Sequence, residues 1–352
     1  MEKKWLIVLI ILAIIVVLGI IILLLIKPQL SPNSNSNLET CNSLSYSSSS
    51  AKNLVFFATE KQAREYSQYL ESISPYNQNS FNIYFLDYSP ECELYQGKAV
   101  LCYNSDLIKK ASSCPNDIII VIKDYPRNIR SSAYMNVISI NSRDNKNVLI
   151  HEMGHALAFL SDEYVPSTLP RKSENCQKTC DLFKDCFQGC GKEDYYRSIN
   201  SGVMKTLSTS DYGIYNENLI SKYLLNSNAI TGNVIENEVD CSNQQYYLIQ
   251  GVYSDNKITM ESKSIEQGCL GNSGTGDFSY NLILNNKLNY TGNFNPEFIF
   301  TDSSEGGEVL SSDRPFLLKV QIVADSKLLE IRKESVLAKI NLQDIDSRPC
   351  KT

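Results

Sequence analysis

The stretch His151-Glu-Met-Gly-His155 decides how the rest of the chain is interpreted, because it holds both histidines of a chain of 352 residues. Residues four apart in a helix lie one above the other, so the two imidazoles would project from one face about 6 Å apart. Both rings can then bind one zinc ion. Glu152 lies beside them, where its carboxylate can take a proton from a water molecule that the metal activates. The stretch therefore predicts a Zn²⁺ site with His151 and His155 as ligands and Glu152 as general base.

Two other interpretations of this stretch are a chance match on a buried helix and a zinc ion with a purely structural role. Two histidines placed at random would show this arrangement in about one of a few thousand such chains. The surrounding apolar residues recur at helical spacing and would face a core: Val148, Leu149, Met153, Ala156, Leu157 and Leu160. Asn141 or Ser142 is the expected cap of this helix.

The net charge argues against a nucleic-acid partner, and the cysteine content indicates an oxidising compartment. A net charge of -6 leaves no basic patch, so we expect no nucleic-acid partner. Eleven cysteines are too many for ordinary core positions and predict disulfide bonds formed in an oxidising compartment. The odd number leaves at least one cysteine free or bonded to another chain.

The N-terminal segment predicts a membrane anchor. Trp5 to Ile26 is an uncharged apolar run of 22 residues, long enough to cross a bilayer core of about 30 Å. A cleavable signal peptide is the rival interpretation. We expect residues 1–27 to be a cytoplasmic tip and an anchor that contacts the lipid bilayer through residues 5–26, with the body outside the cell membrane.

A flexible stalk is expected to follow, because residues 28–52 are rich in Ser and Asn. Cys41 lies in this segment. It could pair with Cys350 or with a second molecule.

Strand and helix patterns alternate over residues 53–234, which indicates an α/β arrangement. Strands are expected at Leu54–Ala58, Phe81–Tyr88, Asp117–Lys123 and Val137–Asn141, and helices at Glu60–Ile73 and Ser105–Ser112. The strand Val137–Asn141 directly precedes the histidine helix. We expect it either to border a cleft, where an extended substrate adds by backbone hydrogen bonds, or to be an ordinary sheet edge.

The segment His151–Tyr164, HEMGHALAFLSDEY, resembles the IgA peptidase family of metzincin-like zinc metallopeptidases. Members show HExGH followed by Leu-x-Asp-Glu-Tyr, matched here by Leu160 to Tyr164. The segment Asp124-Tyr-Pro-Arg127 also resembles the end of a strand in that family, but the following loop, residues 128–136, lacks the family's glycines. The resemblance implies hydrolysis of a protein or peptide substrate, and nothing in the sequence supports immunoglobulin as the target.

The third zinc ligand is expected to be Asp162, or else Glu163. In an unbroken helix Asp162 would lie about 10 Å from His155 along the axis, so the helix must end and the chain must reverse. Metzincins use a glycine for this turn where the present chain has Ala158, at a cost of about 1 kcal/mol. A carboxylate from a later helix is a third choice. Tyr164 is a candidate to line the cleft.

Ser201-Gly-Val-Met204, followed by a helix at Asn216–Asn226, resembles the methionine turn that forms a hydrophobic floor under the metal in metzincins. A single methionine is otherwise ordinary core packing. We therefore treat Met204 as a candidate site residue.

The insertion at residues 174–192 contains four cysteines, in two pairs that are each four residues apart. Two facing helical turns would join Cys176 to Cys190 and Cys180 to Cys186. Four thiolates around a second, structural zinc are the alternative, which the oxidising compartment disfavours.

Residues 235–352 change to short alternating strands, which predict a β-sandwich of roughly seven strands. The expected strands are Tyr246–Tyr253, Lys257–Ser262, Phe278–Leu284, Pro315–Val323, Leu328–Arg332 and Val336–Leu342. Cys241 and Cys269 could brace this region. The sequence does not indicate an oligomeric state.

The sequence thus predicts an N-terminal transmembrane helix, an α/β zincin domain of metzincin type and a C-terminal all-β sandwich. The expected function is that of a membrane-anchored zinc endopeptidase facing outward. The alternative is a surface binding or adhesion protein on a zincin scaffold without catalysis, and the intact Glu152 argues against it.

Overall fold

The fold is taken from a computed structural model that describes residues 38–345 except 78–80, 171–172, 226–239, 272–273, 285–286, 302–307, 310–312, 325 and 344. The described residues belong to one compact unit that begins at Leu38. The predicted anchor at residues 5–26 and the first part of the predicted stalk lie outside the described residues. The expected domain boundary at residue 235 lies outside them too.

The predicted fold class, an α/β zincin with a transmembrane helix and a β-sandwich, was wrong. The structure is mostly β, with 36% strand and 16% helix, and the described residues form nineteen strands and four helices. The prediction overestimated helix because it rested on the strand–helix alternation of residues 53–234. Short antiparallel strands outside that alternation extend the main sheet and shift the balance.

The prediction of a single-pass membrane protein is also corrected. Among the helices of the described residues, none combines the length and apolar character needed to cross a membrane. The predicted span itself falls on residues that the structure does not describe.

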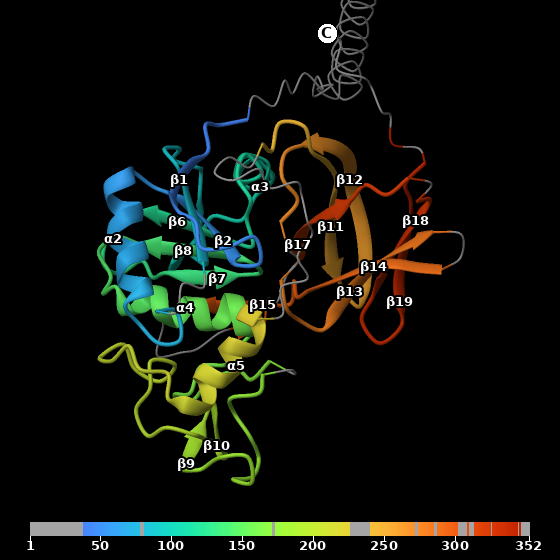
Figure 1. Cartoon of the computed structure of the whole chain (residues 1–352). Helices are drawn as coiled ribbons and strands as arrows, with labels where there is room; N and C mark the ends of the chain where they lie inside the picture. The colour runs from blue at the N-terminus through green and yellow to red at the C-terminus, as the bar shows by residue number, and fades with distance from the viewer. Residues whose placement is uncertain are drawn as a thin grey trace, which may run out of the picture. The chain divides into compact units, whose positions relative to one another are not determined.

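An eight-stranded mixed sheet in the order β1-β3-β2-β6-β8-β7-β15-β16 organises the N-terminal part (Figure 1). Its strands are β1 Asn42–Ser45, β2 Lys52–Phe57, β3 Phe81–Leu86, β6 Ile118–Lys123, β7 Ser132–Tyr134, β8 Val137–Asn141, β15 Phe298–Thr301 and β16 Glu308–Val309. The pairs β3–β2, β2–β6 and β6–β8 are parallel and the others antiparallel. A small hairpin, β4 Glu93–Tyr95 with β5 Ala99–Leu101, lies beside it.

Both faces of this sheet are covered, which explains why β6 reads as a continuous run of β-branched residues. One core joins alternate residues of β2 and β6 to helices α2 Glu60–Glu71, α4 Asn147–Ala158 and α5 Ile214–Leu225. The other core joins the remaining alternate residues to α3 Ser105–Ala111 and to strands from the C-terminal part. Successive side chains of each strand point to opposite faces of the sheet, so they pack alternately into two separate cores.

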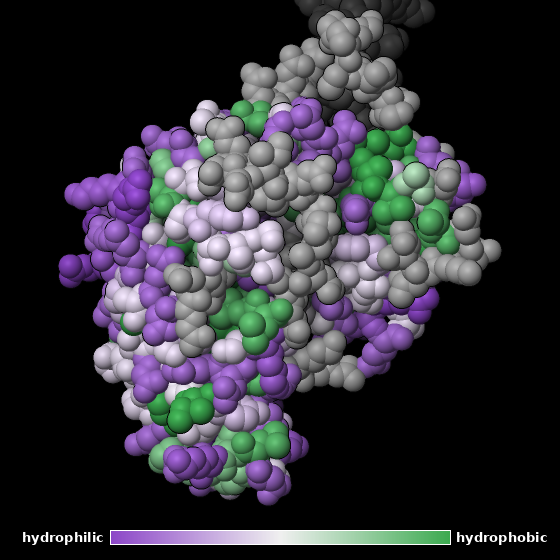
Figure 2. Space-filling view, viewed as in Figure 1, coloured by the Kyte–Doolittle hydropathy of each residue, from purple (hydrophilic) through white to green (hydrophobic). Residues whose placement is uncertain are grey.

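Helix α2 shows how local sequence sets these boundaries. Thr59 accepts a hydrogen bond from the backbone N–H of Gln62, whose side chain in turn bonds to the backbone of Thr59, a capping box. Its buried residues lie on one side, and Figure 2 shows mainly hydrophilic side chains over α2 on the face in view. Hydrophobic patches on that face lie over the region of α5, β9 Phe187–Cys190 and β10 Lys192–Arg197 at the bottom of the view, and also near its centre and at its upper right.

The C-terminal part contains two further sheets, in the orders β12-β11-β17 and β14-β13-β18-β19. Their strands are β11 Gln245–Ser254, β12 Lys257–Gln267, β13 Phe278–Leu284, β14 Lys287–Phe294, β17 Arg314–Gln321, β18 Leu328–Arg332 and β19 Val336–Asn341. Side chains of both sheets share one core. All six strands predicted here are observed, but β14, β15 and β16 were not predicted. Strand β15 leaves this part of the fold and pairs with β7.

Three local predictions need correction. Residues 38–52 do not form a free stalk, because β1 pairs with β3. Strand β8 is not an edge, since it pairs with β6 on one side and β7 on the other. The cap of α4 is Lys146, without a side-chain bond. Asn141 instead donates to the carbonyls of Pro126 and Ile129, so its amide holds the preceding loop.

Five disulfide bonds connect ten of the cysteines in the described residues. The pairing of Cys41 with Cys350 or a second molecule was wrong, and Cys350 lies outside the described residues. Because the four cysteines of the insertion are disulfide-bonded, they leave no thiolates for a second zinc. The bonds indicate an oxidising, extracellular environment, and they are Cys41–Cys114, Cys92–Cys102, Cys176–Cys190, Cys180–Cys186 and Cys241–Cys269.

Lys319 of β17 joins the C-terminal part to the N-terminal sheet. Its ammonium donates to Asn116 Oδ1 at 2.8 Å and to the Cys269 carbonyl at 3.1 Å. Burial lowers the pKa of Lys319 to about 7, against the opposing attraction of Asp117. The folded chain therefore binds a proton at Lys319 less readily than the unfolded chain does.

We expect the free energy of unfolding to rise by about 1 to 3 kcal/mol between pH 7 and 10, less than full burial would give because the residue keeps some exposure. The unfolded chain retains a lysine pKa near 10.4, so it binds more protons than the folded chain over this range. Lys319→Met should flatten the rise in urea denaturation, and Lys257→Met, at an exposed position, should not. Equal slopes for all three proteins would contradict the assignment.

Candidate metal centre

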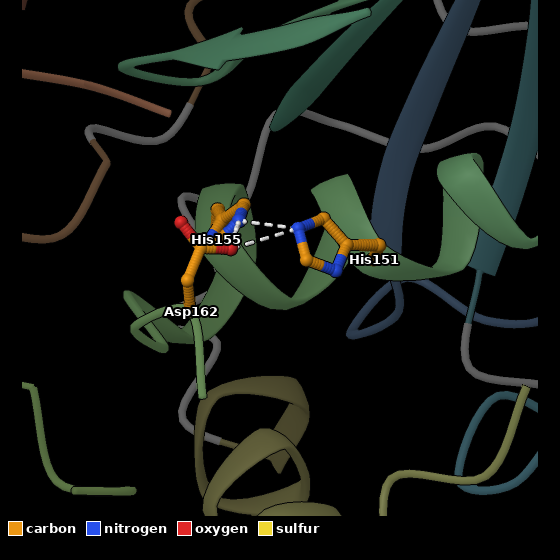
Figure 3. Close-up of side chains that lie close together, drawn as sticks. All are labelled: His151, His155 and Asp162. Carbon is orange, nitrogen blue, oxygen red and sulfur yellow. Dashed lines mark hydrogen bonds and ion pairs between the residues drawn. The ribbon is translucent and has the colours of Figure 1, made fainter. Parts of the chain in front are cut away.

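Helix α4 brings His151 and His155 together as their spacing requires. Their Nε2 atoms lie 3.0 Å apart, and Asp162 Oδ1 lies 3.0 Å from His151 Nε2 and 3.4 Å from His155 Nε2 (Figure 3). The three residues His151, His155 and Asp162 are 2%, 1% and 1% exposed, respectively. In the described residues this is the His/Cys/Asp/Glu cluster whose ligand atoms lie close enough together to hold a metal ion.

The other nitrogen of each ring fixes the direction in which Nε2 points. His151 Nδ1 lies 2.8 Å from the Val203 carbonyl oxygen, and His155 Nδ1 lies 2.6 Å from that of Leu160. A carbonyl oxygen only accepts, so each Nδ1 carries the proton and donates it. In the neutral rings both Nε2 lone pairs therefore point into the cluster, as in metal-binding histidines whose tautomer is held by a backbone carbonyl.

The chain reverses at Phe159, which adopts a left-handed conformation with φ 54°. The turn therefore lies one residue beyond the predicted Ala158. A phenylalanine adopts the left-handed conformation there, at a conformational cost of about 1 kcal/mol. After the turn, the Leu160 N–H donates to the Gly154 carbonyl at 3.1 Å. This bond directs the following residues back along α4, and Asp162 reaches the histidines.

Asp162, and not Glu163, is the carboxylate of the cluster. Burial raises the pKa of Asp162, but the charge and hydrogen bond of His155 or His151, when that ring is protonated, outweigh burial and hold the pKa of Asp162 well below its usual range. Burial also lowers the pKa of His155, which favours its neutral form. Glu163 Oε1 instead accepts from Asn216 at 2.8 Å and Asn175 at 3.2 Å.

Burial raises the pKa of Glu163 to about 7, and the hydrogen bonds from those two asparagines oppose the increase. Glu163 is therefore a buried carboxyl that braces the segment after Asp162. Its backbone N–H donates to the Met204 carbonyl at 2.8 Å.

Asn175 holds the segment that carries Asp162, and no motif in the sequence indicates this role. Its Oδ1 accepts from the Ser161 N–H at 2.8 Å, and its Nδ2 donates to the Ser161 carbonyl at 2.9 Å. The next residue, Cys176, is bonded to Cys190. The Cys-rich insertion thus attaches directly to the turn that positions the carboxylate.

Met204 packs against α4 at Gly154, and its role as a hydrophobic floor under a metal stays a prediction. It is fully buried, and a Cβ built at Gly154, between the histidines, would lie 2.8 Å from Met204 Sδ and 3.1 Å from Tyr212 Cε1. The same loop supplies the Val203 carbonyl to His151. Gly154 is therefore required for close approach, because a side chain there would displace the loop.

Phe300 of β15 also belongs to the centre and was not predicted. Its ring stacks on that of His155 with centroids 3.9 Å apart and an interplanar angle of 15°. It also meets the Phe159 ring edge-on at 5.7 Å. The strand Phe298–Thr301 is short and isolated from the alternating pattern around it, so periodicity could not reveal it.

Glu152 and Tyr164 are the remaining predicted site residues. Glu152 is fully buried on α4 and is not part of the His–His–Asp cluster, so its role as general base stays a prediction. Tyr164 is partly buried and also lies outside the cluster, so its role in a cleft stays a prediction.

The cluster fits a divalent metal ion. Bonds of about 2.0 to 2.1 Å in a tetrahedral arrangement separate ligand atoms by about 3.3 Å, close to the observed 3.0, 3.0 and 3.4 Å. Two imidazole lone pairs and a carboxylate that converge in a buried space repel one another, and a cation removes that repulsion. Three protein ligands also leave a coordination position for water or substrate, as in catalytic sites.

No known family model and no curated protein matches this chain. The expected zinc and peptidase assignments therefore gain no support from a relative. The resemblance to the IgA peptidase family stays a prediction.

We expect Asp162→Asn to weaken binding of a divalent metal more than about 100-fold. Loss of a residue that only hydrogen-bonds to a metal ligand already lowers metal affinity about 10- to 100-fold, and Asp162 is expected to bind the metal directly. Glu163→Gln is the matched control and should change affinity less than about threefold, since its oxygen can still accept from the two asparagines. Competition titration with Co²⁺ measures both. The assignment is wrong if Glu163→Gln loses the metal and Asp162→Asn keeps it.

Gly154→Ala should destabilise the fold by about 1 to 3 kcal/mol, although alanine normally favours a helix by about 1 kcal/mol. The added methyl group would press on Met204. Met204→Ala in the same chain should recover part of the loss, giving a favourable coupling in a double-mutant cycle by urea denaturation. If Gly154→Ala alone were as stable as the native chain, Met204 would not be tightly packed against Gly154.

Proposed function

We propose that this protein is a zinc-dependent endopeptidase, with His151, His155 and Asp162 as metal ligands. The observation that carries the proposal is the buried His–His–Asp cluster with a glutamate next to its first histidine on the same helix. Zn²⁺ suits this set of nitrogen and oxygen donors. Iron(II) also uses two histidines and a carboxylate, so metal analysis of the purified protein is the first test.

The metal would supply Lewis-acid activation of water and of the substrate carbonyl. Glu152 accepts the proton of the attacking water at its carboxylate and then donates it to the leaving amine. The carbonyls of Val203 and Leu160 hold the two imidazoles in the tautomer that presents Nε2. The buried surroundings strengthen every electrostatic interaction in the site.

The proposed substrate is a protein or peptide, which follows from the resemblance of His151–Tyr164 to the IgA peptidase family. The loop at residues 128–136 departs from that family, so no side-chain preference is carried over. The disulfide bonds agree with a substrate met outside the cytosol.

The competing function is a surface binding protein on a metal-containing scaffold without catalysis. It would keep the metal ligands but would not need a buried carboxylate at position 152, since burying an ionisable group without a role is costly. Metal binding without cleavage of any peptide would favour this alternative.

Glu152→Gln should retain a full equivalent of metal and lower peptide hydrolysis at least about 100-fold, the lower range for loss of an acid–base group. Hydrolysis is measured on a mixed library of quenched fluorescent peptides, with metal content measured in the same samples. Glu163→Gln is the control for a neighbouring buried glutamate and should keep its metal. Undiminished turnover in Glu152→Gln would refute the mechanism.

A further inference from the structure

The groups proposed to act on a peptide are almost fully enclosed. Glu152 is 0% exposed, and each member of the His–His–Asp cluster is 2% exposed or less. A peptide carbonyl must come within bonding distance of the metal and of Glu152 to react. Part of the surroundings must therefore move before a polypeptide can enter.

Strand β15 is the element placed to move. It pairs antiparallel with β7 at three positions, Ile299↔Tyr134, Phe300↔Ala133 and Thr301↔Ser132. Strand β7 itself lies against α4, the helix of the histidines. Without β15, β7 would be the free edge of the sheet beside the metal centre, and an extended peptide adds to such an edge by main-chain hydrogen bonds.

The side chains of β15 support the same conclusion. Phe300 points toward the centre and stacks on His155, whereas Ile299 points to the opposite face and packs into the second core. A peptide strand paired with β7 in this register would place alternate side chains toward the metal in the same way. Strand β15 thus has the position and the alternation of an extended substrate.

We propose that β15 occupies the substrate-binding edge of β7, so that the described structure is a closed state, and that β15 leaves this edge when a peptide binds. The inference rests on the proposed peptidase function and names where its substrate lies. Strand β15 pairs with β7 at only three positions, but its opening exposes Phe298, Ile299 and Phe300, which are 4%, 0% and 3% exposed. The closed state is therefore the stable one without substrate, and a peptide that replaces β15 must offset this cost through its own pairing with β7.

The test uses Phe300→Ala and Ile299→Ala, with Ile331→Ala as a matched control. Ile331 is a fully buried isoleucine in the sheet core of β18, away from the metal. The first readout is the rate at which EDTA extracts Co²⁺ from the loaded chain. The second is amide hydrogen exchange in β7 of the metal-free chain.

Both β15 variants should speed extraction at least tenfold and increase exchange in Ser132–Tyr134, and Ile331→Ala should change neither by more than twofold. If Phe300→Ala alone speeds extraction, Phe300 only positions His155 and the proposal fails. If Ile299→Ala matches Ile331→Ala, β15 is a fixed part of the sheet. Faster extraction with no peptide hydrolysis in any variant would support the closed state and refute the peptidase function.

Discussion

The convergence of two imidazole nitrogens and one carboxylate oxygen in a buried space is the constraint on which the centre depends. The two Nε2 lone pairs and the Asp162 carboxylate oxygen lie 3.0 to 3.4 Å apart. Their mutual repulsion costs free energy away from water, so the surrounding fold must hold these atoms in place. Helix α4 fixes the histidines through their spacing. The reversal at Phe159 brings Asp162, seven residues beyond His155, back to the same point.

Contacts from distant parts of the chain hold that reversal in place. The carbonyls of Leu160 and Val203 orient the rings, and Asn175 binds both backbone groups of Ser161. The disulfide next to Asn175 ties this contact to the Cys-rich insertion. On the other side of the centre, Phe300 brings in a strand from the C-terminal part. Three segments that are distant in sequence therefore meet at the metal centre: the Cys-rich insertion, the loop that contains Val203, and strand β15.

The sequence predicted those features that depend on local spacing. The strands β2, β6 and β8 and the histidine helix follow from periodicity. The disulfide pairs within the insertion were predicted correctly, but the expected helical turns are not observed, because none of their four cysteines lies in a helix. Asp162 was expected as the third ligand on the condition that the chain reverses after the histidine helix. The position of that reversal was not predicted correctly, because the αL conformation of Phe159 depends on tertiary contacts that outweigh local preference.

Features that depend on long-range pairing were missed or wrong. The short strand β15 has no periodic signal of its own, and its pairing with β7 could not be inferred. The same limit explains why β8 was expected at an edge and Cys41 with Cys350. The overall class was wrong because short antiparallel strands, each weak in sequence, together make the structure mostly β. Asn175 carries no motif, so its two bonds to Ser161 were visible only in the fold.

X-ray absorption at the K-edge of the metal in the purified protein tests the central claim most directly. We expect one metal per chain with two imidazoles and oxygen ligands, all at about 2.0 to 2.2 Å. A spectrum with sulfur ligands at about 2.3 Å, fewer than two imidazoles or no metal bound would contradict the centre described above.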